Sequence, residues 1–140
     1  MRRGGGRPSA GAVEIHRRLA AAHPASYEPD LAMSLNNLSD RLSEAGDSVG
    51  ALEAIREAVE IYRRLAAARP ARYEWELATS LGALGTLLRE ARKIPEAKDA
   101  FREGAELVRP HAQRFPEGPD ARLLAYLEGQ LRDLDETRDA

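Results

Sequence analysis

A chain of 140 residues is long enough for one ordinary domain, and much of its 43% hydrophobic content is Ala and Leu, with only 5% aromatic residues. This composition favours helices and argues against a large β-sheet core. The net charge is −2, but Arg2, Arg3 and Arg7 precede residue 10, so the remainder carries 18 basic and 23 acidic side chains, or −5. That balance argues against nucleic-acid binding, and the lack of cysteine excludes disulfides and thiolate metal sites.

No apolar run approaches the roughly 18 residues that a membrane-spanning helix needs. The first eight residues are basic but are not followed by the apolar segment of a signal peptide. The sequence therefore predicts a cytoplasmic protein that does not contact a membrane.

An internal repeat is the strongest signal in the sequence. When the chain is shifted by 46 residues, positions 12–45 align with positions 58–91, and 22 of these 34 positions are identical. A third, weaker copy places Leu123, Leu127 and Leu134 in register with Leu77, Leu81 and Leu88. A fixed period of this size is typical of a stacked array of similar units.

Leucines at helical spacing predict helices, and glycine and proline residues predict where these helices begin and end. Gly46 marks a helix C-terminus, Pro95 suits the first turn of a helix, and Pro110 is expected to kink a helix or end it early. Pro24, Pro70 and Pro116 are expected in longer connections. The predicted helices span residues 10–22, 29–45, 49–68, 75–91, 95–114 and 119–136.

These elements predict an all-α helical-hairpin solenoid of about six helices. Residues 1–9 are expected to form a flexible Gly- and Arg-rich leader, and residues 10–137 are expected to form the repeat domain. The domain divides into a partial unit, two full units and a capping helix, at residues 10–28, 29–74, 75–118 and 119–137.

The repeated unit resembles the tetratricopeptide repeat, whose pattern is W-x2-L-G-x2-Y followed by A-x3-F. In the second full unit Leu84, Gly85 and Leu88 are followed by Ala97 and Phe101. In the first, Leu38, Ser39 and Leu42 are followed by Ala51 and Ile55. The small residues Gly85 and Ser39 are expected to let two helices approach closely.

The sequence departs from the tetratricopeptide pattern in two ways. Leucine replaces the aromatic residues of the first helix, and each unit has 46 residues where the family has about 34. In its composition and repeat length the chain is similar to long Ala/Leu/Arg-rich repeats that serve as sensor or partner-binding arms in large bacterial signalling proteins.

The resemblance implies a non-enzymatic module that binds a peptide or helix of a partner protein in a groove. The alternative is a regulatory or sensor arm related to bacterial signalling ATPases or proteases. Helical spacing predicts the residues that line the groove on the first helix of each full unit: Met33, Asn36, Asn37, Asp40, Thr79, Ala83, Thr86 and Arg89. The same residues also suit an ordinary solvent-facing surface.

The first predicted helix lacks the helix that should precede it in a complete unit. Val13, Ile15 and Leu19 would then present apolar surface at an open end. This surface predicts either a homodimer or descent from a longer array.

Catalytic, metal and cofactor sites are not indicated. The histidines His16, His23 and His111 do not have the spacing of metal ligands. The three glycines at residues 4–6 do not form a phosphate-binding loop, because no predicted strand precedes them and no lysine of the required pattern follows them. A stripe of Arg18, Arg64 and Arg69 could hold an anionic ligand, although solvation and helix capping also explain these arginines. We therefore predict that the chain is not an enzyme and needs no cofactor.

Overall fold

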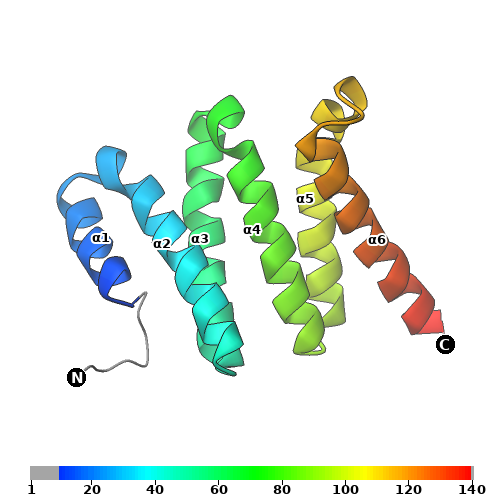
Figure 1. Cartoon of the computed structure of the whole chain (residues 1–140), viewed down its shortest axis with the longest axis horizontal. Helices are drawn as coiled ribbons and strands as arrows, with labels where there is room; N and C mark the ends of the chain where they lie inside the picture. Colours follow the sequence, from blue (N-terminus) through cyan, green and yellow to red (C-terminus); the bar gives the residue numbers. More distant parts are fainter. Residues whose placement is uncertain (1–9, 140) are drawn as a thin grey trace. The chain divides into compact units, whose positions relative to one another are not determined.

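The computed structural model describes residues 10–139, and in this range the chain is all α-helical. The described residues form six helices joined by short connections, which are labelled α1 to α6 in Figure 1. The all-α prediction, with its six helices, is confirmed. The predicted leader, residues 1–9, lies outside the described residues. The helices are α1 (Ala10–Ala22), α2 (Pro24–Glu44), α3 (Ser48–Ala68), α4 (Pro70–Glu90), α5 (Ile94–Arg114) and α6 (Pro119–Asp139).

The chain forms two compact units, Met1–Ala67 and Ala68–Ala140. Unit 1 holds α1, α2 and nearly all of α3, whereas unit 2 holds α4, α5 and α6. The finer division at residues 28/29 and 74/75 stays a prediction. No helix in the described part is both long and apolar enough to cross a membrane.

Two of the three prolines that were expected in long connections begin helices instead, whereas Pro116 does lie in the connection between α5 and α6. Pro24 and Pro70 each stand at the start of a helix, where the missing N–H has no intrahelical partner to lose. The residues before them, His23 and Arg69, share the same extended φ of −139°. The predicted connections at Pro24 and Pro70 are therefore wrong: α2 and α4 each begin about one turn earlier than expected.

Pro110 was expected to kink or end its helix, yet α5 continues to Arg114. Pro29 likewise lies inside α2. A proline within a helix leaves the carbonyl four residues earlier without its usual donor, here at Ala25 and Glu106. Both of these residues are exposed, so water can satisfy their carbonyls. The expectation of an early end to α5 is therefore wrong.

The two hairpin turns have the same geometry, although their residues differ. Gly46 has a left-handed φ of +87°, and Arg92, which occupies the same place in the second copy, has φ +64°. In each turn the next residue donates a backbone hydrogen bond into the preceding helix, from Asp47 to Leu42 at 2.8 Å and from Lys93 to Leu88 at 2.9 Å. The predicted end of α2 at Gly46 is confirmed.

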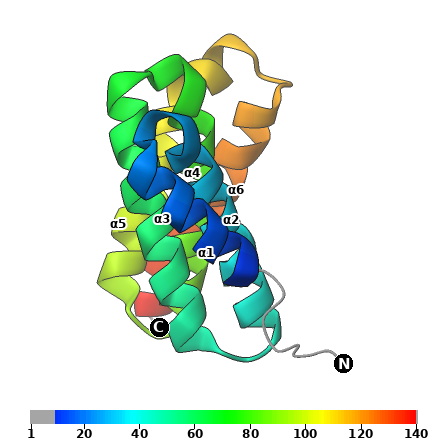
Figure 2. The same ribbon diagram turned by 90° about the vertical axis from the view of Figure 1, so that its left-hand side faces the viewer.

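In unit 1, α1 packs against α2, and α2 packs against α3 (Figures 1 and 2). Val13 and Ala20 of α1 are buried, as are Leu31, Leu35 and Leu42 of α2. The hydroxyl of Ser39 donates a 2.8 Å hydrogen bond to the backbone carbonyl of Ala51, which directly ties α2 to α3. The predicted close approach of Ser39 and Ala51 is confirmed.

In unit 2, α5 packs against both α4 and α6 (Figure 1). Phe101 of α5 is 0% exposed, and its ring fills the space over Gly85 of α4. A Cβ atom on Gly85 would lie 2.6 Å from this ring. The Leu127 side chain of α6 lies against Gly82 and Gly104, on α4 and α5. Glycines therefore create the room for two of the large side chains in the unit 2 core.

We predict that Gly85→Ala destabilises the protein. Replacing glycine by alanine inside a helix normally stabilises it by up to about 1 kcal/mol. Here the new methyl group would overlap the buried ring of Phe101, and overpacking of this kind costs about 1–3 kcal/mol. The free energy of unfolding, measured by urea titration followed by circular dichroism, should decrease.

Gly129→Ala is the matched control, because the nearest atom to its added Cβ would be a flexible Arg132 nitrogen at 3.7 Å. This variant should be as stable as the wild type or more stable. Equal effects of the two substitutions would show that Phe101 does not limit the approach of α4 and α5.

Candidate partner-binding surfaces

The predicted groove residues of unit 1 lie together on one face of α2, which we call the α2 face: Met33, Asn36, Asn37 and Asp40. Helical spacing places this face opposite the buried leucines of α2. Met33 is 52% exposed, Asn37 and Asp40 are exposed, and Asn36 is half-buried. The α2 face therefore presents one large apolar side chain among amides and a carboxylate.

The predicted groove residues of unit 2 are less accessible, because α6 engages two of them. Thr86 and Tyr126 share a 2.7 Å hydrogen bond between their hydroxyl groups, and Arg89 donates a 2.6 Å hydrogen bond to Gln130. Thr79 and Ala83 are half-buried, and the Thr79 hydroxyl donates to the Glu76 carbonyl at 3.0 Å. The structure thus brings the four residues to one side of α4, where Thr79, Thr86 and Arg89 each already make a hydrogen bond within unit 2.

Two exposed aromatic residues next to these positions were not predicted. Trp75 lies one turn before Thr79 and is 39% exposed, while Tyr126 is 44% exposed. The four-residue spacing from Trp75 to Thr79 was available in the sequence and would have identified the tryptophan. Tyr126 falls in register with the buried Ser80, so the repeat register gives no signal that this residue is exposed.

The two copies of the repeat differ mainly along the first helix of each unit. Twelve of the 34 aligned positions differ (34 − 22), and nine of these twelve lie between residues 29 and 43. All four residues of the α2 face are replaced in the second copy, whereas the buried leucines are kept. The packing of the hairpins therefore does not require the particular side chains of the α2 face.

Residues 31–67 match the tetratricopeptide repeat family model. The match covers 37 residues (67 − 31 + 1), about a quarter of the chain, and takes in most of α2 and almost all of α3. We call this segment the tetratricopeptide hairpin. The same comparison found no catalytic family, and a search of curated proteins found no match. The predicted resemblance is confirmed for this hairpin, while the bacterial, 46-residue variant stays a prediction.

The predicted self-association residues do not form one exposed face. Val13 is 5% exposed and packs in the core of unit 1, Leu19 is half-buried, and Ile15 is 50% exposed. An apolar residue that already packs against α2 cannot also form an interface between two copies. Only Ile15 of the three presents most of a large apolar side chain to solvent.

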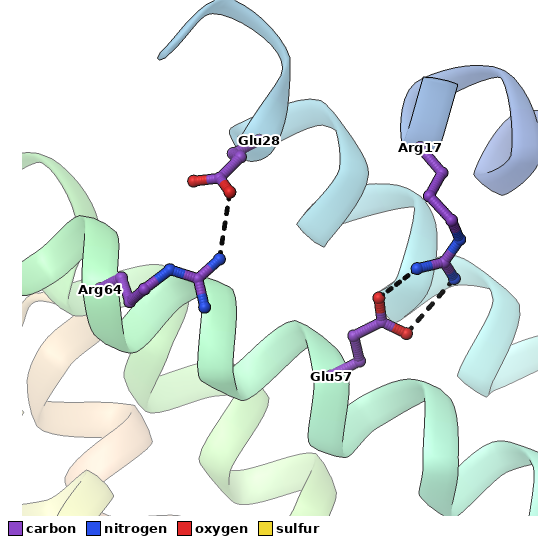
Figure 3. Close-up of polar contacts among 4 residues, drawn as sticks. All are labelled: Arg17, Glu28, Glu57 and Arg64. Carbon is purple, nitrogen blue, oxygen red and sulfur yellow. Dashed lines mark hydrogen bonds and ion pairs between the residues drawn. The ribbon is translucent and has the colours of Figure 1, made fainter. Parts of the chain in front are cut away.

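Two ion pairs tie the tetratricopeptide hairpin to its neighbours in unit 1 (Figure 3). Arg17 of α1 donates two hydrogen bonds to the carboxylate of Glu57 on α3, and Arg64 of α3 donates one to Glu28 of α2 at 3.1 Å. The hydrogen bond to Glu57 raises the pKa of Arg17 above its ordinary value. Since Arg64 is engaged with Glu28, it is not an unused cation of the predicted anion-binding stripe; Arg18 and Arg69 are exposed.

The position of unit 2 that corresponds to Arg64 holds a different residue. Glu74 aligns with Glu28, but Pro110 stands where the first copy has Arg64. The next residue, His111, places Nε2 3.8 Å from Glu74. Within the described residues no cluster of His, Cys, Asp or Glu has the arrangement of a metal site.

We predict that Arg17→Gln lowers the stability of unit 1 by at most about 1 kcal/mol, because Arg17 and Glu57 are partly exposed and water screens their attraction. The raised pKa keeps Arg17 charged: its contribution is complete below the unfolded-state pKa and is lost only as the pH rises through the higher folded-state pKa. Arg17 therefore stays charged at neutral and acidic pH, and its own titration does not weaken the ion pair there. Added salt should weaken the contribution of the ion pair to stability, because it screens the two charges.

The measurement is urea unfolding of wild type and variant at low and high salt, with Arg18→Gln as the control on the adjacent exposed residue. The difference between Arg17→Gln and wild type should shrink at high salt, and Arg18→Gln should behave like wild type. An equal loss in both variants would show that general helix charge, and not the Glu57 pair, is responsible.

Proposed function

We propose that this chain is a protein-interaction module that binds a peptide or helix of a partner protein on the α2 face. The tetratricopeptide match supports a protein-interaction role in general. The observation that carries the specific proposal is the 52% exposure of Met33 on the first helix of the matched hairpin, one turn before Asn37 and two turns before Asp40 on the same face. No enzymatic step is assigned to the chain.

The chemistry of the α2 face suits a polypeptide ligand. A primary amide both donates and accepts hydrogen bonds, so the Asn37 side chain can pair with a peptide backbone regardless of its sequence. Met33 is unbranched and polarisable, and such side chains adapt to different apolar partners. The carboxylate of Asp40 would favour a ligand with a basic residue beside its apolar anchor.

Unit 2 is expected to contribute less to binding than the α2 face of unit 1, and through different residues. Thr86 and Arg89 already hold α6, so they are poor candidates for ligand contacts. Trp75 remains as an exposed aromatic residue, a type that is enriched among the residues that dominate binding energy at interfaces. The α2 face is therefore the primary binding site of this proposal.

We predict that Met33→Ser and Asn37→Ala each weaken binding of a peptide selected by display against the full chain. Truncation of a central interface residue costs more than about 1 kcal/mol, which is at least fivefold in Kd. Kd values from fluorescence anisotropy should therefore rise, while far-UV circular dichroism stays unchanged because both positions are exposed.

Ile15→Ser is the control, because Ile15 is an equally exposed apolar residue on α1 and is not part of the α2 face. Its Kd should equal that of the wild type. If Ile15→Ser weakened binding while Met33→Ser and Asn37→Ala did not, the α2 face would not be the site.

A further inference from the structure

The thioether of Met33 is an oxidisable group that the α2 face presents to solvent. The chain has no cysteine and two methionines, Met1 and Met33, of which Met33 lies within the described residues. Met33 is 52% exposed, so a dissolved peroxide has access to its sulfur. Because no thiol of the chain competes for the peroxide, Met33 is the described residue that a mild oxidant should modify first.

The position of Met33 separates the binding surface from the core. Leu35 and Leu42 are buried, and each lies about half a helical turn around α2 from Met33. Oxidation of a buried methionine disrupts the surrounding core, because an apolar side chain becomes polar. At Met33 the new polar group would stand in solvent, so oxidation should change what the α2 face can bind and leave the packing of the helices intact.

The second copy of the repeat does not share this chemistry. Thr79 stands 46 residues after Met33 and occupies the same place in the repeat. Its hydroxyl donates a hydrogen bond of 3.0 Å to the backbone carbonyl of Glu76, and a hydroxyl group cannot form a sulfoxide. Sensitivity to a mild oxidant is therefore a property of the α2 face and not of the corresponding side of α4.

We propose that Met33 is a reversible oxidation site that regulates peptide binding on the α2 face, an inference that rests on the proposed function. Hydrogen peroxide or an organic peroxide transfers one oxygen atom to the Met33 sulfur. An S–O bond forms, the O–O bond of the peroxide breaks, and water or an alcohol leaves. The sulfur loses two electrons and the peroxide gains them, so no further reactant is needed.

The sulfoxide removes the one large apolar side chain of the α2 face. Asn37 and Asp40 are exposed polar residues, so an oxidised Met33 leaves this face without an apolar anchor. An apolar residue of the ligand would then displace water from the sulfoxide oxygen without replacing its hydrogen bond, which is unfavourable. Oxidation should therefore weaken binding, and reduction of the sulfoxide should restore it.

The first measurement locates the oxidation. The full chain is treated with hydrogen peroxide, the peroxide is removed, and the peptides of a digest are weighed by mass spectrometry. In the folded chain Met33 should gain one oxygen atom at a rate within about threefold of its rate in urea, because its side chain is exposed. A Met33 that is oxidised in urea but stays unmodified in the folded chain would overturn the proposal.

The second measurement compares Kd values by fluorescence anisotropy, with a display-selected peptide free of Met, Cys and Trp as the probe. The Kd of the wild type should rise at least about fivefold when Met33 is oxidised. Treatment with both methionine sulfoxide reductases, one for each sulfoxide epimer, should restore the original Kd. Far-UV circular dichroism should stay unchanged, because Met33 lies outside the core.

Met33→Leu is the matched control, because leucine has a similar volume but no sulfur, and this variant keeps Met1 and Trp75. Its Kd should be the same before and after peroxide treatment. A peroxide effect of equal size in Met33→Leu, or an unchanged Kd of the wild type with Met33 fully oxidised, would overturn this inference alone. An unchanged Kd for Met33→Ser without peroxide would instead overturn the proposed function, and the regulation with it.

Discussion

The close approach of two helices within each hairpin depends on one small residue in the first helix. In α2 this residue is Ser39, whose hydroxyl reaches the backbone carbonyl of Ala51, and in α4 it is Gly85, over which the ring of Phe101 lies. Ser39 and Gly85 occupy the same position of the repeat, as do Ile55 and Phe101. The larger core side chain is therefore paired with the smaller partner, which keeps the space between the helices filled in both units. A larger residue at either position would force the helices apart and disrupt the leucine core beneath.

This packing determines which surfaces of unit 1 remain for binding. The leucines of α2 face α1 and α3, so the polar side chains on its other side, with Met33 among them, are left in solvent. Two faces of opposite character thus arise from one helix: a buried row of leucines, and the mostly polar α2 face, whose chemistry suits a peptide backbone. A helical hairpin that buries one stripe and exposes the other has the general construction of an interaction module.

The sequence predicted the core better than it predicted the ends and the exposed sites. Identical leucines at helical spacing specify which side of each helix is buried, and Leu35, Leu81 and Leu88 are buried as the pattern requires. Pro24 and Pro70 were misplaced because proline both interrupts helices and begins them, and only the neighbouring backbone distinguishes the two roles. The burial of Val13 and the engagement of Thr86 with Tyr126 depend on contacts between helices. A pattern along one helix does not contain that information, so the predicted self-association face and the unit 2 groove were placed without knowledge of their neighbours.

The most direct test of the central claim, that the α2 face binds a partner polypeptide, uses the methionine methyl groups. The chain has two methionines, Met1 and Met33, so selective carbon-13 labelling of the methionine ε-methyl groups gives two NMR signals, which Met33→Leu assigns. During titration with a display-selected peptide, the account predicts that the Met33 signal moves and saturates with the Kd measured by anisotropy. A peptide that binds fully while the Met33 signal stays in place would contradict the account.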